Sequence, residues 1–217
     1  MKIIPESSNY GRLWRTMRAC MGGGLLGMDM GQQAVRVVEL KRRRGLWTCP
    51  HRGSAPVAPG VMYEGSVEDV DGMADAVRQA WSSSGSACAR VALAMPDATL
   101  ITQAIRLPAG LPDEQLEILV ELEAAQYMPF ALEDASLDFC ILGPAGSDEI
   151  DVLLVIARRA GVQRRLDAVA AAGLHAVVMD SEALALQAAE LQGGWRGLPD
   201  GAAYQLAWGL AMHRYAG

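Results

Sequence analysis

Residues 26–31, with the sequence LGMDMG, decide the fold class of this chain. Residues 25–30 are apolar apart from Asp29, and they predict a buried β-strand. The strand ends in the pattern G-x-D-x-G, formed by residues 27–31. A second run rich in β-branched residues, residues 34–40, follows the short turn at 31–33 and predicts another strand. The fold is therefore expected to begin with two strands joined by a glycine-containing turn.

Strands and helices alternate along the rest of the chain without internal repeats, which predicts the α/β class. The expected further strands are residues 90–95, 100–107, 137–142, 151–157 and 176–179. The expected helices are residues 67–82, 113–127, 161–172, 181–191 and 204–215. Residues 46–60 contain Pro50, Pro56 and Pro59, and we expect them to be irregular.

The N-terminal segment, residues 1–24, has a different character. Residues 10–21 place their apolar side chains within about 120° of arc on a helical wheel, with three arginines outside it, which predicts a small basic amphipathic helix. Such a helix lies on an anionic membrane surface, docks on another protein or packs on its own domain; the last is slightly favoured. Three glycines at 22–24 then form a linker.

Composition and charge bound the function. The chain has 217 residues, of which 51% are hydrophobic, and this is enough to build a packed interior. Its net charge is −6, which argues against general nucleic-acid binding, because neutralising phosphates requires an excess of Lys and Arg. The charge is unevenly distributed: residues 1–60 carry ten basic against three acidic residues, whereas residues 61–217 carry nine against 22.

No metal or membrane-spanning signal is found in the sequence. The cysteines and histidines are scattered and form no CxxC or related pattern, so we expect no metal site: Cys20, Cys49, Cys88, Cys140, His51, His175 and His213. The longest apolar stretch, residues 19–28, is about half of the ~20 residues that a membrane-spanning helix requires. We see no convincing signal peptide, and we expect a cytoplasmic protein.

Several segments, taken in order along the chain, form a recognisable set. They are LGMDMG at 26–31, VALAMP at 91–96, IRLP at 105–108, ELEAAQYMPF at 121–130, LDF at 137–139, DVLLVIAR at 151–158, and AGL at 172–174 leading to Asp180. Together they resemble PilM, the FtsA-like component of type IV pilus machines. The resemblance covers roughly residues 25–191, and the last expected helix is similar to the end of a PilM.

The resemblance implies a partial actin-like, ribonuclease H-like fold. It assigns residues 25–101 with 178–217 to subdomain 1A and residues 102–177 to an inserted subdomain 1C, while the second lobe of the family has no counterpart in the sequence. In actin-like proteins ATP binds between two lobes, and Asp29 would face the magnesium side of the first phosphate loop. The site residues implied for a nucleotide are Gly27, Asp29, Gly31 and Gln32.

We expect no ATPase activity and weak or no ATP binding, hence no cofactor. One half of a two-lobed site cannot bury a nucleotide or exclude water, and Gln32, Gln33 and Ala34 stand where small hydroxyl residues usually contact phosphate. The favoured interpretation of Gly27, Asp29 and Gly31 is a retained strand turn. No HExxH, GxSxG or GxxxxGK[ST] motif is present, so the chain is not expected to be an enzyme.

The resemblance further implies an adaptor role. PilM proteins bind the short cytoplasmic tail of PilN, a single-span inner-membrane protein, in the groove between subdomains 1A and 1C. This places the chain at the cytoplasmic face of the inner membrane in a type IV pilus platform, or in a related secretion or competence system. The implied groove residues, for each of which core packing is the favoured alternative, are Met95, Pro96, Leu107, Tyr127, Met128, Phe130 and Phe139.

Alternatives remain. In the first alternative, the chain is a nucleotide-binding module that completes its ATP site through another chain. In the second, it is a degenerate product with no function beyond folding. The in-frame final helix with its apolar face argues against the second. Loss of the second lobe would uncover a face of subdomain 1A, which a homo-oligomer or the N-terminal helix would have to cover. Peripheral membrane association is compatible with all but the degenerate product.

Overall fold

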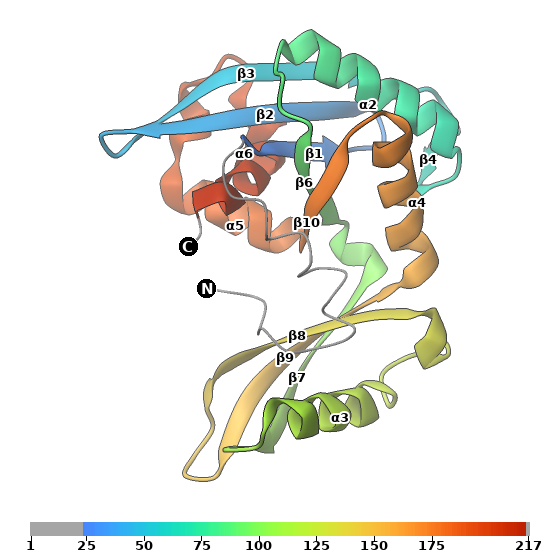
Figure 1. Ribbon diagram of the computed structural model, residues 1–217, viewed down its shortest axis with the longest axis vertical. Coiled ribbons are helices and arrows are strands. Elements are labelled where there is room, and N and C mark those ends of the chain that lie inside the picture. The colour runs from blue at the N-terminus through green and yellow to red at the C-terminus, as the bar shows by residue number, and fades with distance from the viewer. Residues whose placement is uncertain (1–23, 216–217) are drawn as a thin grey trace. The chain divides into compact units, whose positions relative to one another are not determined.

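The computed structural model describes residues 24–215, and their side chains as far as residue 213 (Figure 1). The amphipathic helix predicted at 10–21 lies outside the described residues. The described chain divides into two compact units, residues 98–162 (the small unit) and residues 24–97 with 163–215 (the large unit). The assignment to subdomains 1A and 1C, with boundaries at 101/102 and 177/178, stays a prediction.

A five-stranded mixed sheet organises the large unit. Its strands are β1 (Leu26–Met30), β2 (Ala34–Arg43), β3 (Leu46–Pro56), β6 (Arg90–Met95) and β10 (His175–Ser181), in the order β10-β6-β1-β2-β3. β1, β6 and β10 are parallel, and β2 is antiparallel to both of its neighbours. This α/β arrangement is the ribonuclease H-like sheet of actin-like folds, as predicted.

Helices cover both faces of this sheet. Gly53, in β3, lies against helix α2 (Val70–Ser84): a Cβ there would be 2.2 Å from the Ala80 carbonyl oxygen. Gly27, in β1, lies equally close to helix α6 (Gln205–Ala211). Gly53 pairs with Val37 and Gly27 with Val38, and consecutive strand residues point to opposite faces. Thus α2 and α6 pack on opposite sides of the sheet.

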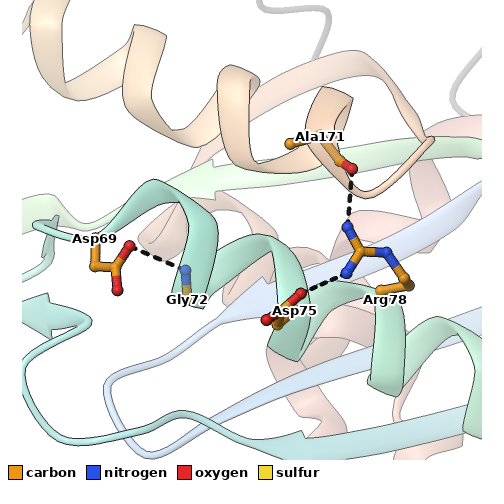
Figure 2. A network of polar contacts seen from close by, with 5 residues as sticks. All are labelled: Asp69, Gly72, Asp75, Arg78 and Ala171. Carbon is orange, nitrogen blue, oxygen red and sulfur yellow. Dashed lines mark hydrogen bonds and ion pairs between the residues drawn. The ribbon is translucent and has the colours of Figure 1, made fainter.

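Helix α2 is well defined at both ends. The Asp69 side chain accepts a hydrogen bond from the Gly72 amide, 3.0 Å (Figure 2). Gly85 adopts the left-handed conformation with φ +66° after the last turn. Arg78 pairs with Asp75 and donates to the Ala171 carbonyl, 3.0 Å, at the end of helix α4 (Arg159–Ala171). The side chain therefore caps a free carbonyl of a neighbouring helix.

The remaining elements of the large unit surround the sheet. Two short strands, β4 (Met62–Tyr63) and β5 (Ser66–Val67), form a separate hairpin. Helix α5 (Glu182–Gln192) follows β10 and packs on α6, where Gly209 is in close contact with the backbone of Ala185. Ser181 caps α5 by accepting from the Leu184 amide, 3.2 Å. The buried side of α6 carries Ala207, Trp208, Leu210 and Ala211.

The small unit is an antiparallel sheet with one helix against it (Figure 1). Strands β7 (Leu100–Pro108), β8 (Ala135–Pro144) and β9 (Glu149–Arg158) lie in the order β7-β9-β8. Helix α3 (Asp113–Ala124) buries Leu116, Val120 and Ala124 against Leu137, Val152, Leu154 and Ile156 of the strands. Alternation of buried and half-buried residues along the middle of β9 follows from packing one sheet face on this helix.

Three predictions of secondary structure were wrong. Residues 46–56 are strand β3, not irregular chain. The helix predicted at 113–127 ends at Ala124 and is followed by a tighter turn, in which the Tyr127 amide donates to the Ala124 carbonyl. The helix predicted at 204–215 is α6 flanked by two short 3₁₀ turns, Gly201–Tyr204 and Met212–Tyr215.

Candidate functional site

The carboxyl ends of the three parallel strands bring acidic side chains to one edge of the large unit's sheet. Asp29 lies near the end of β1, Asp97 follows β6, and Asp180 lies near the end of β10. Glu182 opens helix α5 directly after β10. In open α/β sheets this edge is where ligands usually bind.

Asp29 is compensated by the protein's own cations. Its carboxylate lies 3.5 Å from Arg36, its antiparallel partner on β2, and its side chain is only 14% exposed. Burial raises the pKa of the Asp29 carboxyl, while the charges of Arg36 and Arg165 act in the opposite direction. The sequence motif named Asp29 as a residue of a remnant phosphate loop, and in the structure its surroundings are those of an ion pair with Arg36.

Arg165 is the buried cation of this edge. It projects from α4, is 2% exposed and donates to the Gly65 carbonyl, 2.8 Å, in the β4–β5 hairpin. Burial lowers its pKa, and the charges of Glu182 and Asp29 oppose that shift. Burial also raises the pKa of Glu182, with Asp29 adding to the shift and Arg165 opposing it. Arg165 is thus a buried positive charge that acts on two carboxylates from different elements and is held in place by the Gly65 carbonyl.

The other two acids have structural partners. The Asp97 carboxylate accepts from the Ala183 amide, 3.3 Å, in the first turn of α5, where a negative charge is stabilised by the helix dipole. Asp180 bonds to His213, with 2.6 Å between carboxylate oxygen and Nε2, and to the Ser181 amide, 2.8 Å. These contacts join the end of β10 to α5 and to the turn after α6.

The turn after β1 does not have the form of a phosphate cradle. Gly27 lies inside β1, where it pairs with Val38 and Ala92, and a Cβ on it would be 1.8 Å from the Ala207 carbonyl oxygen. Its lack of a side chain is explained by the approach of α6. The Gly31 amide donates to the Ala34 carbonyl, 3.1 Å, so that N–H is used within the turn. Gln32 is exposed.

Magnesium and ATP, which the actin-like fold class implies, do not fit this edge. Asp29 already has two arginines as counter-ions, and the Gly31 amide is engaged in the turn. Within residues 24–215, no three His, Cys, Asp or Glu side chains are grouped closely enough to hold a metal ion. The chemistry available here is ion pairing inside the fold.

The predicted partner-binding residues fall into three groups. Leu107 and Phe139 belong to the core of the small unit, with exposures of 4% and 6%. Met128 and Phe130 are half-buried against the same core, in the segment between α3 and β8, and Tyr127 beside them is 37% exposed. Arg158 covers the Phe130 ring, 4.3 Å from its centroid. Met95 and Pro96 lie in the large unit, Met95 being fully buried in β6.

Arg36, Arg165, Glu182 and the Asp180–His213 pair were missed by sequence reasoning. Arg36 follows from the register of β1 and β2, since residues paired across antiparallel strands share a face. Arg165 carried one local signal: it stands on the same helical face as Val162 and Ala168, both buried. An arginine on the same helical face as buried apolar residues indicates a buried charge, and such a charge requires hydrogen-bond acceptors or carboxylates around it.

A comparison with protein families matches residues 27–211 to a model described as type IV pilus assembly protein PilM. The chain belongs to the PilM family. The second lobe of the family has no counterpart in the sequence of this chain, as the resemblance implied.

A solved structure of the family agrees with this assignment. A chain of the PilM–PilN type IV pilus biogenesis complex is 27% identical, with a TM-score of 0.70, and the match covers 81% of this protein. The present chain spans about half, 52%, of the length of that PilM–PilN chain. The cytoplasmic domain of EpsL, an inner-membrane component of the type II secretion system of Vibrio cholerae, is 17% identical with a TM-score of 0.48, covering 75% of this chain and 58% of that one.

Within the part of the PilM-family chain that the structure describes, no helix is both long and apolar enough to cross a lipid bilayer.

Proposed function

We propose that this PilM-family protein is an adaptor in type IV pilus assembly that binds the cytoplasmic tail of a PilN-like inner-membrane protein. One observation carries the proposal: four-fifths of the chain matches a component of a complex that contains PilN, at 27% identity. The proposal places the protein in the cytoplasm, recruited to the inner membrane by its partner.

The segment between α3 and β8 is the part of the predicted binding surface that is open to a partner. Tyr127 is 37% exposed, and Met128 and Phe130 are half-buried. Aromatic and methionine side chains of this kind supply contact area to an apolar peptide at a low cost in conformational entropy. Leu107 and Phe139 would support this segment from the core beneath it.

We further propose that the protein works without catalysis and without a nucleotide. The support is the double compensation of Asp29 by Arg36 and Arg165 and the use of the Gly31 amide within its own turn. Binding Mg-ATP there would first require both arginines to be displaced. Mg-ATP-dependent dimerisation of the purified protein would contradict this part of the proposal.

The test is a titration of the full chain with a synthetic peptide of the PilN N-terminal tail, followed by calorimetry. We expect saturable binding in the micromolar range or tighter, about −8 kcal/mol. Tyr127→Glu should abolish it without unfolding the protein, since this side chain is already partly exposed. Tyr63→Glu is the matched control, because Tyr63 is 62% exposed and lies in the large unit. Absence of binding to every such tail from the same organism would disprove the adaptor proposal.

A further inference from the structure

The far end of the β2–β3 hairpin is the most strongly basic surface of the described chain. Lys41, Arg42, Arg43 and Arg44 are consecutive, and all four are exposed. Residues 40–63 contain no Asp or Glu at all, in a chain whose net charge is −6. Within residues 24–215, no carboxylate lies within ion-pair distance of these four side chains. They are free to take an external anion.

The register of the hairpin separates its two faces. Arg42 pairs with Trp47, and Arg43 pairs with Leu46. Trp47 points to the helices: its indole N–H donates to the Gln192 side chain, 3.2 Å, at the end of α5, and it packs beside the core under α6. Arg42 covers the Trp47 ring at 5.4 Å. Because neighbouring strand residues alternate, Arg43 and Leu46 share the opposite face.

Leu46 gives this face its distinctive character. Its side chain is 73% exposed, directly opposite Arg43 and two residues from Arg44. The loop itself is short and defined: Arg44 and Gly45 both have positive φ, +49° and +81°, as the two central residues of a type I′ turn do. The surface is thus preformed, with one apolar side chain surrounded by cations, and the Trp47 contact holds the hairpin on the body of the large unit.

We propose that the end of the β2–β3 hairpin docks the protein on an anionic phospholipid bilayer. Lys41 and Arg43, on the same face as Leu46, and Arg44 in the turn bind lipid phosphates, because the negative surface potential of the bilayer attracts basic clusters. Leu46 enters the boundary between headgroups and acyl chains, where long basic side chains extend around it to the phosphates. A nucleic acid offers the same phosphates but no apolar layer for Leu46, and this favours the bilayer as the partner.

The inference goes beyond the proposed function and does not depend on it. Tail binding was assigned to Tyr127 in the small unit, whereas the hairpin belongs to the large unit. A bilayer contact would hold the protein beside a membrane-anchored partner and raise the effective concentration of the two. Vesicles that contain no PilN test the lipid contact alone, so failure of one proposal is distinguishable from failure of the other.

The experiment is co-sedimentation of the full chain with vesicles of phosphatidylcholine, with and without phosphatidylglycerol. The main variant is Arg43→Gln with Arg44→Asn. Asparagine suits a positive φ in a type I′ turn, so the hairpin is retained while two charges are removed. The second variant, Leu46→Thr, removes the apolar side chain and introduces a β-branched residue, a type that favours strands. The control, Arg78→Gln with Arg106→Gln, removes two exposed cations from α2 and β7.

We expect the wild type to bind the anionic vesicles and not the neutral ones, with binding that weakens as salt is raised. The Arg43/Arg44 variant should bind roughly thirtyfold more weakly, since each basic residue contributes a factor of about five. Leu46→Thr should lose severalfold, and the control should change binding by less than about threefold. Circular dichroism and the melting temperature verify that each variant is folded.

Two results would overturn the proposal. If the hairpin variants bind anionic vesicles as tightly as the wild type, the contact lies elsewhere, for instance in residues 1–23. If the wild type binds double-stranded DNA as tightly as vesicles, and Leu46→Thr weakens neither, the hairpin is a general polyanion site and not a lipid contact.

Discussion

Arg165 shows how one side chain decides the character of the sheet edge. It is 2% exposed and donates a hydrogen bond to the Gly65 carbonyl, and the charges of Asp29 in β1 and Glu182 in α5 oppose the lowering of its pKa by burial. Removing one member of a buried charge cluster leaves the others desolvated and uncompensated, and that is strongly destabilising. The cluster is therefore sensitive to the loss of Arg165 in a way that a surface ion pair is not.

We predict that Arg165→Met lowers the free energy of unfolding by about 3 kcal/mol at neutral pH. Arg164→Met is the matched control: Arg164 is the next residue on α4, with a side chain 44% exposed and an ion pair to Glu68, and its loss should cost less than about 1 kcal/mol. Chemical denaturation of the three proteins measures the difference. Equal, small effects would show that Arg165 is not the counter-ion of the edge.

The same cluster makes stability depend on pH. Burial raises the pKa of both Asp29 and Glu182 above their ordinary values of 3.8 and 4.5. A raised carboxyl pKa adds to the free energy of unfolding below the unfolded-state pKa, and this contribution is lost as pH rises through the folded-state pKa. Asn and Gln do not titrate, so the doubly substituted protein lacks this loss.

We therefore predict that Asp29→Asn with Glu182→Gln gains stability relative to the wild type as pH rises from about 4 to about 7. Urea denaturation at a series of pH values measures the difference between the two proteins. A difference that stays constant, or that falls with pH, would mean that Arg36 and Arg165 outweigh burial at both carboxyls.

Among the elements, the β2–β3 hairpin has a turn residue whose backbone conformation is unfavourable for its residue type. Arg44 has φ +49°, a left-handed conformation that is unfavourable for most side chains and readily adopted by Asn and Gly. We predict that Arg44→Asn raises the free energy of unfolding by about 0.5 kcal/mol. Arg43→Asn, at an ordinary strand position, should not. A neutral or negative effect of Arg44→Asn would indicate that the arginine stabilises the hairpin through its side chain.

The same hairpin marks where sequence reasoning fails at the level of elements. Prolines at 50 and 56 predicted irregular chain, because proline cannot donate to a ladder. The sheet order places β3 at an edge, and its register with β2 shifts between Glu39 and Lys41, opposite Cys49 and Pro50. An edge strand with a bulge accommodates proline, but both facts belong to the tertiary arrangement. Strands flanked by turns, such as β6, were predicted to the residue.

In the candidate site too, a local sequence pattern predicted some residues, whereas others became apparent only in the structure. Asp29 was predicted because the G-x-D-x-G pattern is local, a strand followed by its turn. The cations that act on it, Arg36 and Arg165, come from the strand register and from a helix far along the chain, so no local pattern pairs them with Asp29. Gly27 was assigned to phosphate from the same motif, while the structure explains it by the approach of α6. A local motif thus predicts where a residue lies along its strand, whereas tertiary packing decides which side chains surround that residue.

At the scale of the whole molecule, the chain has two units with separate hydrophobic cores. The small unit's core consists of side chains from residues 101–156, whereas the cores beside α6 draw on Leu25, β2, β6 and the C-terminal helices. The described tryptophans, Trp47, Trp81, Trp195 and Trp208, all lie in the large unit. Tryptophan fluorescence therefore reports on that unit, provided that Trp14 is replaced by phenylalanine.

We predict that Leu154→Ala, at a fully buried position of β9, destabilises the small unit by about 2–5 kcal/mol and leaves the tryptophan transition in place. The amides of β7, β8 and β9 should lose protection from hydrogen exchange, because local opening follows the stability of each cooperative unit. Leu210→Ala, which removes a buried side chain from α6, should instead lower the midpoint of the tryptophan transition. If Leu154→Ala lowers both the hydrogen-exchange protection of the small unit and the midpoint of the tryptophan transition, the two units unfold as one cooperative unit despite their separate cores.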